Sequence, residues 1–240
     1  MEGGRVDVLR SQHPSPRASV AAVPALRNTL RTAPDEPRAP LNHAVEAAAR
    51  PPILDLLRER TRASHERAEE SLPLLDPALD PARYREILAG FWGFHAALEP
   101  RLMDAARRLG LDAQARRKLP LLERDLRALG EDPAALPVAD EVPEIDGMAA
   151  ALGCMYVLEG ATLGGRVISR HLATRGIEVD SGGAYFAGYG EETGPRWKEF
   201  SAAIGAYAGA HPDDAGRMVR AADETFTLLE RWLARAMETA

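Results

Sequence analysis

A single histidine lies on the apolar face of the first helix that the sequence predicts. Apolar and small residues recur at steps of three and four over residues 54–72, and His65 holds one of these positions. Glu69 follows four residues later, where its carboxylate can accept the second N–H of the imidazole. Arg58 and Arg62 precede the histidine by two turns and one turn, and they could flank an anion. This pattern suits an axial metal ligand, although a hydrogen-bonded core histidine would give it too.

Four glycines interrupt a later segment that is otherwise strongly helical, residues 151–172. They are Gly153, Gly160, Gly164 and Gly165. Each costs about 0.5–1 kcal/mol relative to alanine in a helix, so the missing side chains must serve a purpose. The first three share one helix face. Close packing of two helices and close approach of a flat ligand to bare backbone both explain that face.

Two motifs together resemble the haem oxygenase family, especially the bacterial type that supplies biliverdin to bacteriophytochromes. LRERTRASHERAE at 57–69 resembles the family's proximal helix, and YVLEGATLGGRVI at 156–168 resembles its glycine-rich distal helix. The stretches 84–99 and 185–200 fit more loosely, and the resemblance spans about residues 53–235. It implies an all-α, single-domain helical bundle that degrades haem.

The resemblance also implies a role for each matched residue. His65 corresponds to the proximal iron ligand and Glu69 to its hydrogen-bonding partner, while Gly160 and Gly164 lie over the distal haem face. Contacts to the edges and propionates of the haem are expected from a further set of residues: Arg58, Tyr156, Gly165, Tyr185, Arg196 and Lys198.

One position departs from the family pattern. Many members carry an aspartate directly after the first distal glycine, whereas this chain has Ala161. Glu159 or Thr162 could compensate, although helix geometry turns Glu159 about 100° from Gly160. A haem-binding or haem-sensing protein without turnover is therefore one alternative. A thiaminase-like relative that acts on another small molecule is a second.

The expected reaction uses haem as both substrate and cofactor. A histidine-ligated haem binds O₂ once it is reduced, and bare glycine backbone presents no acid that would promote O–O cleavage. The products are then biliverdin, CO and Fe²⁺. The sequence has no GxGxxG-type nucleotide site, so the electrons are expected from another protein, a ferredoxin or a flavin reductase. A bacteriophytochrome is a possible recipient of the product.

Other residues that could do chemistry are read as structural. His95 lies among aromatic residues with Glu99 one turn later, and a buried hydrogen-bonded histidine is the favoured interpretation. His171 is assigned no role. HERAE at 65–69 is not a zinc-binding HExxH motif, and the paired Glu-x-x-His motifs of di-iron bundles are absent.

Helices are predicted throughout the chain after Pro51. Their expected ranges are 53–71, Pro81 to Gly110, 112–129, 144–175, 195–210 and from Pro212 to near the C-terminus. Residues 131–143 are expected as a loop, and the glycine-rich stretch 181–194 as a loop or broken helix. The sequence thus predicts a helical domain over 51–240. Residues 1–50, with scattered proline and arginine, are predicted as a disordered tail or an artefact of a misassigned start.

Composition narrows the class of protein. The 240 residues carry a net charge of −6, which disfavours binding to nucleic acid or an anionic membrane. Cys154 is the single cysteine, so an internal disulfide is impossible and a cytoplasmic location is expected. No continuous apolar run approaches the roughly 20 residues of a membrane helix, so no membrane span is expected.

Overall fold

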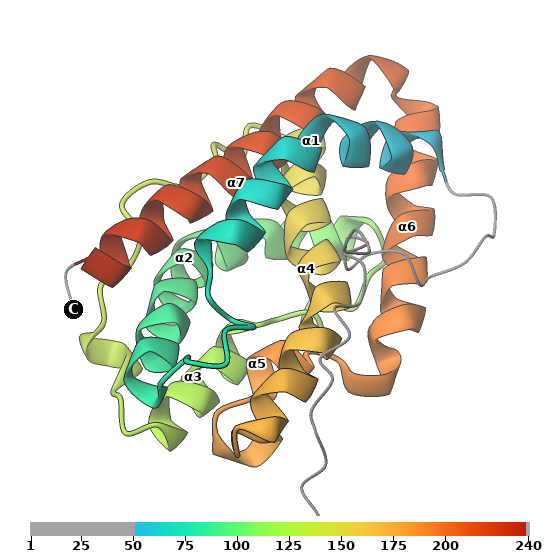
Figure 1. The fold of residues 1–240 in the computed structure, drawn as a ribbon. Helices are drawn as coiled ribbons and strands as arrows, with labels where there is room; N and C mark the ends of the chain where they lie inside the picture. The colour runs from blue at the N-terminus through green and yellow to red at the C-terminus, as the bar shows by residue number, and fades with distance from the viewer. Residues whose placement is uncertain (1–50, 239–240) are drawn as a thin grey trace, which may run out of the picture. The chain divides into compact units, whose positions relative to one another are not determined.

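The computed structural model describes residues 51–238, and all contacts discussed below lie within that range. The tail predicted at residues 1–50 falls outside the described residues. Every regular element in the described range is a helix (Figure 1), so the prediction of an all-α fold is confirmed.

The first two helices begin where the prolines predict. α1 (Pro52–Ser71) has a proline at its first position, where no intrahelical N–H is needed. α2 (Pro81–Arg108) follows Asp80, whose carboxylate accepts a hydrogen bond from the Arg83 amide at 2.8 Å. Local sequence alone therefore determines both helix starts.

The third helix is shorter than predicted. α3 (Leu119–Ala128) begins at residue 119 and not at residue 112. Asp112 instead closes a turn by accepting the Ala115 amide at 3.0 Å. Glu99 of α2 then accepts the amides of Lys118 and Leu119, at 2.6 and 3.0 Å, and so caps the start of α3. This cap comes from a neighbouring helix, which is why the local pattern does not reveal it.

The remaining helices follow the prediction with shifted ends. α4 (Met148–Thr174) starts at 148 and not at 144, α6 (Thr193–Ala210) starts two residues early, and α7 (Ala215–Glu238) follows a single 3₁₀ turn at Pro212–Asp214. The short α5 (Ala184–Ala187) lies in the stretch expected to be broken. There Gly182, Gly188 and Gly190 take positive φ angles of 117°, 58° and 59°.

Three of the long helices pack against α7. They are α4, α1 and α2, and in Figure 1 α7 runs diagonally across the fold. α1 packs against α7 and α6, whereas no extensive contact joins α1 to α4. The crossing of α4 and α7 is close because Gly153 has no side chain: a Cβ there would collide with the Met218 carbonyl and lie 2.9 Å from the Ala221 Cβ. α7 therefore packs against both α1, which contains His65, and α4, which contains the glycines.

No membrane span is expected from the sequence, yet one described helix is long and apolar enough to cross a membrane by length and composition alone. That helix is α4, in which alanine and larger aliphatic residues alternate with glycines and are interrupted by Glu159 and Arg166. In its most apolar window, 61% of the residues are buried inside the fold. α4 thus has the features of a core helix.

Candidate functional site

His65 has an acidic partner at one ring nitrogen and none at the other among the described residues. Its Nδ1 lies 3.5 Å from Glu69 Oε2, as the spacing predicts, and its ring meets the Phe226 ring of α7 edge-on at 5.5 Å. The side chain is 31% exposed, and within residues 51–238 no group pairs with Nε2. An imidazole oriented through one nitrogen while the other is unpaired can bind a metal.

Hydrogen bonds next to His65 hold α1 against α7. The Ser64 hydroxyl donates to Asp223 Oδ1 at 2.5 Å and accepts from Arg67 Nη2 at 3.1 Å. Arg67 Nε also lies 3.5 Å from Glu230 Oε2. The helix that carries the histidine is thus fixed in rotation by polar contacts to α7.

The glycines of α4 separate into two kinds. Gly165 lies against the Phe186 carbonyl, where an added Cβ would come within 2.5 Å, and Gly153 lies against α7. Gly160 and Gly164, called the glycine pair below, lie beside open space. A Cβ at Gly160 would meet one atom of Trp197 at 3.9 Å, and a Cβ at Gly164 would meet nothing within 4 Å. Protein packing explains the first kind, while the glycine pair leaves bare backbone beside room for a ligand.

Neither residue next to the Gly160–Ala161 pair supplies the carboxylate that many members of the family carry at position 161. Ala161 is exposed. Glu159 is buried and paired elsewhere, and the Thr162 hydroxyl donates to the Glu159 carbonyl at 2.6 Å. Neither Glu159 nor Thr162 therefore takes over the role of an aspartate at 161.

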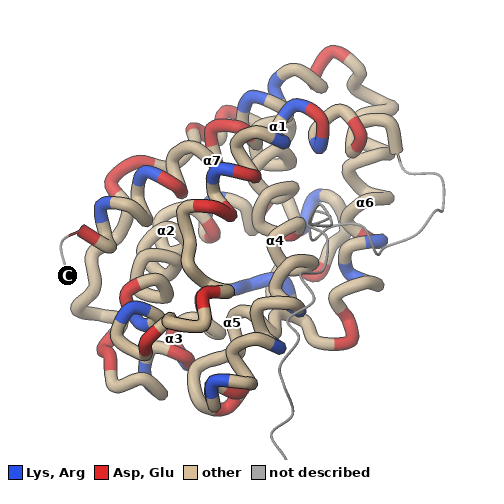
Figure 2. Tube along the Cα trace, in the orientation of Figure 1, with Lys and Arg blue, Asp and Glu red and all other residues tan. Residues whose placement is uncertain are grey.

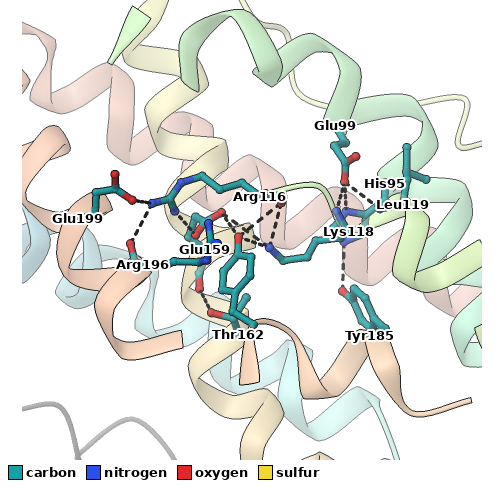
Figure 3. A network of polar contacts seen from close by, with 11 residues as sticks. His95, Glu99, Arg116, Lys118, Leu119, Glu159, Thr162, Tyr185, Arg196 and Glu199 are labelled. Carbon is teal, nitrogen blue, oxygen red and sulfur yellow. Dashed lines mark hydrogen bonds and ion pairs between the residues drawn. The ribbon is translucent and has the colours of Figure 1, made fainter. Parts of the chain in front are cut away.

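A buried ionic cluster surrounds Glu159 of α4, the residue directly before the glycine pair (Figure 3). We call Glu159, Arg116, Lys118 and Tyr189 the rear cluster. Glu159 Oε2 accepts from Arg116 Nη1 at 2.6 Å, and its Oε1 accepts from the Tyr189 hydroxyl at 2.8 Å. Lys118 Nζ donates to the Tyr189 hydroxyl and to the Arg116 carbonyl, and it lies 3.8 Å from Glu159 Oε1. One carboxylate of α4 thus joins the segment before α3 to the segment after α5.

The rear cluster reaches the surface through α6. Arg116 Nη2 donates to Glu199 at 2.6 Å and to the Arg196 carbonyl at 3.1 Å. Glu199 is 49% exposed, whereas the Arg116 side chain is only 2% exposed. Figure 2 shows the basic run 116–118 as a blue stretch in the middle of the view. A cavity of about 20 Å³ lies between the Arg116, Lys118, Glu159 and Glu99 side chains, which is room for one water molecule.

Burial and local contacts shift the pKa values of Lys118, Tyr189 and Glu99. Burial lowers the pKa of Lys118 to about 8, although Glu159 and Glu99 oppose the shift. Burial also raises the pKa of Tyr189, and the Glu159 charge adds to that rise. Burial would raise the pKa of Glu99, but contacts with His95 and with the amides at the start of α3 hold it below its usual value.

His95 is a buried, hydrogen-bonded histidine, as the sequence predicts. Its Nε2 pairs with the Tyr185 hydroxyl at 3.1 Å, and its Nδ1 lies 3.7 Å from Glu99 Oε2. Burial lowers the pKa of His95 more than Glu99 raises it. The Tyr185 ring is packed among His95, Phe91 and Phe186, so its hydroxyl is already in use inside the fold.

The other residues predicted to contact a ligand lie on different elements. Arg58 of α1 and Lys198 of α6 are exposed. Arg196 is half-buried, with its guanidinium 5.0 Å from the Tyr189 ring centroid. Tyr156 of α4 packs against Trp197 at 6.2 Å between ring centroids. The structure thus links His65 to Glu69 and gathers the glycines on α4, but it engages Tyr185 and Gly165 in packing.

Sequence reasoning missed the rear cluster. Arg116, Lys118 and Tyr189 come from segments that are far apart from Glu159 in the sequence, and nothing in their spacing predicts that they meet. Within residues 51–238, no group of three or more His, Cys, Asp or Glu side chains could hold a metal ion.

Comparisons with known proteins agree on one family. Residues 52–235 match the family model described as heme oxygenase. A curated protein of Xanthomonas campestris pv. campestris (strain 8004), named "Heme oxygenase", is 34% identical over 128 residues, which are 52% of this chain and 74% of that protein. The fold resembles that of the NO- and CO-bound haem oxygenase from Neisseria meningitidis, with a TM-score of 0.69 and 21% identity over 78% of this chain and 93% of that one.

Proposed function

The chain belongs to the haem oxygenase family, and we propose on this basis that it cleaves haem to biliverdin, CO and Fe²⁺ with O₂ and external electrons. Family membership makes it an enzyme that binds and degrades haem. The products and the roles of individual residues are our proposal. One observation carries it: an imidazole with an unpaired Nε2 on α1, and a glycine pair beside open space on α4.

Haem fits the residues that are present. It is the substrate, and its reduced iron supplies O₂ binding. His65 Nε2 is suited to hold the iron, while Glu69 orients the ring through Nδ1. Gly160 and Gly164 would let the flat macrocycle approach the backbone of α4, since side chains there would occupy that room.

Exposed cations are proposed to hold the propionates. Arg58 and Lys198 extend into solvent, where they can pair with carboxylates at the haem edge. Arg196 and Tyr156 are proposed to line the pocket wall near Trp197. We assign no haem contact to Gly165 or Tyr185. Gly165 packs against the Phe186 carbonyl, and the Tyr185 hydroxyl is hydrogen-bonded to His95.

Electrons are proposed to come from a ferredoxin or a flavin reductase. A bacteriophytochrome is the proposed recipient of biliverdin, and the proposed location is the cytoplasm. Purified candidate donors, each added to the haem complex under O₂, would identify the one that sustains repeated turnover.

Hemin titration followed by reduction under O₂ tests the function. We expect a Soret band that His65→Ala abolishes or greatly weakens. We expect that band to decay after reduction while biliverdin appears. His95→Gln is the matched control, because His95 is enclosed and paired with Tyr185, and its complex should keep the Soret band. Failure of the wild-type protein to bind hemin would overturn the proposal.

Ala161 motivates a second candidate, a haem-binding protein that does not turn over. The local alternatives for an acid at this position, Glu159 and Thr162, are engaged within the fold. A stable oxygenated complex that never yields biliverdin would favour this candidate. In that case Ala161→Asp should restore turnover, since it adds the carboxylate found in many family members.

A further inference from the structure

We propose that the rear cluster positions the glycine pair, with Glu159 as the α4 residue through which Arg116, Lys118 and Tyr189 act. This inference rests on the proposed function. It concerns positioning residues, since none of the four is placed against the substrate.

The glycine pair cannot be held in place from its own side. Open space lies beside Gly164, and a single Trp197 atom approaches Gly160. Glycines also weaken a helix intrinsically. The position of this half of α4 must therefore be set by contacts on its other faces.

Helix geometry places Glu159 on another face from the glycine pair. At about 100° per residue, its side chain points about 100° from Gly160 and about 140° from Gly164. The cavity beside Glu159 is also lined by Met155 and Leu158, which lie still further round the helix. The rear cluster thus contacts α4 on a different face from the glycine pair, and this direction argues against a direct contact with the substrate.

The contacts of Glu159 are numerous and directional. Arg116 Nη1 and the Tyr189 hydroxyl lie 2.6 and 2.8 Å from its two oxygens, and Lys118 Nζ stands 3.8 Å away. Glu159 is 4% exposed. An apolar contact tolerates sliding, whereas paired charges inside a protein have one good geometry. Three partners from two other segments therefore fix both the rotation of α4 about its axis and its position along that axis at the glycine pair.

A cluster of this kind is costly if its purpose is stability alone. Buried ions lose hydration that their mutual attraction regains only in good geometry, and well-packed apolar residues often do as well. Glu159, through which the rear cluster contacts α4, lies one residue before Gly160. We therefore assign the rear cluster to the placement of the glycine pair.

Glu159→Gln tests the inference, because it keeps the shape and removes the charge. In the haem-free protein, hydrogen exchange should rise several-fold in peptides covering 156–168 and stay unchanged in α2. In the haem complex, we expect the stretching frequency of bound CO to shift and the turnover rate to fall roughly 10- to 100-fold. The dissociation constant for hemin should stay within about threefold, since His65 is untouched.

Tyr84→Phe is the control. It removes another buried hydrogen bond, from the Tyr84 hydroxyl to the Gly182 carbonyl at 2.7 Å, which does not involve α4. It should leave the CO stretching frequency and the exchange at 156–168 unchanged. Glu159→Met is the second variant: we expect it to recover stability through apolar packing, while the CO shift persists.

The two proposals fail in different ways. If wild-type protein makes no biliverdin, the proposed function fails, yet hydrogen exchange and CO stretching still decide the positioning role. Wild-type exchange and CO frequency in Glu159→Gln would overturn the positioning role, and so would a rise in exchange spread evenly over all helices.

Discussion

Arg116 Nη1 lies 2.6 Å from Glu159 Oε2 in the interior, and the same guanidinium reaches Glu199 at the surface through Nη2. The arginine comes from the turn before α3 and the two glutamates from α4 and α6. A single side chain thus connects three parts of the fold that the sequence separates widely.

Arg116→Met should lower the free energy of unfolding by about 3–5 kcal/mol, because it leaves the Glu159 charge buried without its main partner. The double variant Arg116→Met/Glu159→Met should recover a large part of this loss. Urea unfolding of the haem-free proteins measures both. Equal losses in the single and double variants would contradict the expectation.

Lys118→Met should change how stability depends on pH. The folded pKa of Lys118 is about 8 and its ordinary value is 10.5, so the unfolded chain binds more protons between these values. The cost of keeping this lysine charged is present below pH 8 and disappears as the pH rises towards 10.5. The wild-type chain should therefore gain up to about 3 kcal/mol relative to Lys118→Met across that window. Urea unfolding of both proteins at pH 7–10 measures this difference. If the two free energies of unfolding change in parallel with pH, the prediction is wrong.

Gly164→Ala should have opposite effects on stability and on haem binding. The added methyl meets nothing within 4 Å, so helix propensity should stabilise the haem-free protein by about 0.5–1 kcal/mol. The same methyl occupies the proposed ligand space and should weaken hemin binding. Gly153→Ala is the control, because its collision with α7 should destabilise the fold by about 1–3 kcal/mol. Unchanged hemin affinity in Gly164→Ala would remove the glycine pair from the site.

Glu69→Ala should weaken hemin binding without unfolding the protein. Its carboxylate is 40% exposed, and exposed pairs contribute about 1 kcal/mol or less. Loss of the partner that orients His65 should lower affinity about 10- to 100-fold. Glu66→Ala breaks another exposed pair on α1, to Arg62, and should leave the affinity unchanged. Equal affinities in the two variants would show that Glu69 does not orient the ligand.

Local signals were enough to predict most of the fold. Asp80 and Pro81 mark the start of α2, and the steps of three and four identify the face of α1 on which His65 lies. The predicted start of α3 was wrong, because Glu99 of α2 caps this helix from outside the local sequence. Such a cap depends on the tertiary arrangement, so no local pattern contains it.

The candidate site was predicted in part for a similar reason. The pairing of His65 with Glu69 follows from their spacing along one helix. The same logic cannot distinguish Gly164 from Gly165, which differ only in what lies opposite them, open space or the Phe186 carbonyl. In the rear cluster, Glu159 pairs with Arg116, 43 positions away, and with Tyr189, 30 positions away, and only the assembled fold brings them together.

α7 contacts both helices of the proposed site, α1 and α4. Its Ala221 sets how closely α4 approaches at Gly153, and its Phe226, little more than one turn further on, supports His65. The distance between the two sides of the site is therefore set by a helix for which no ligand contact is proposed. Substitutions along α7 can therefore shift α1 and α4 relative to each other without altering either motif, and variation in the position of ring cleavage would be sought there first.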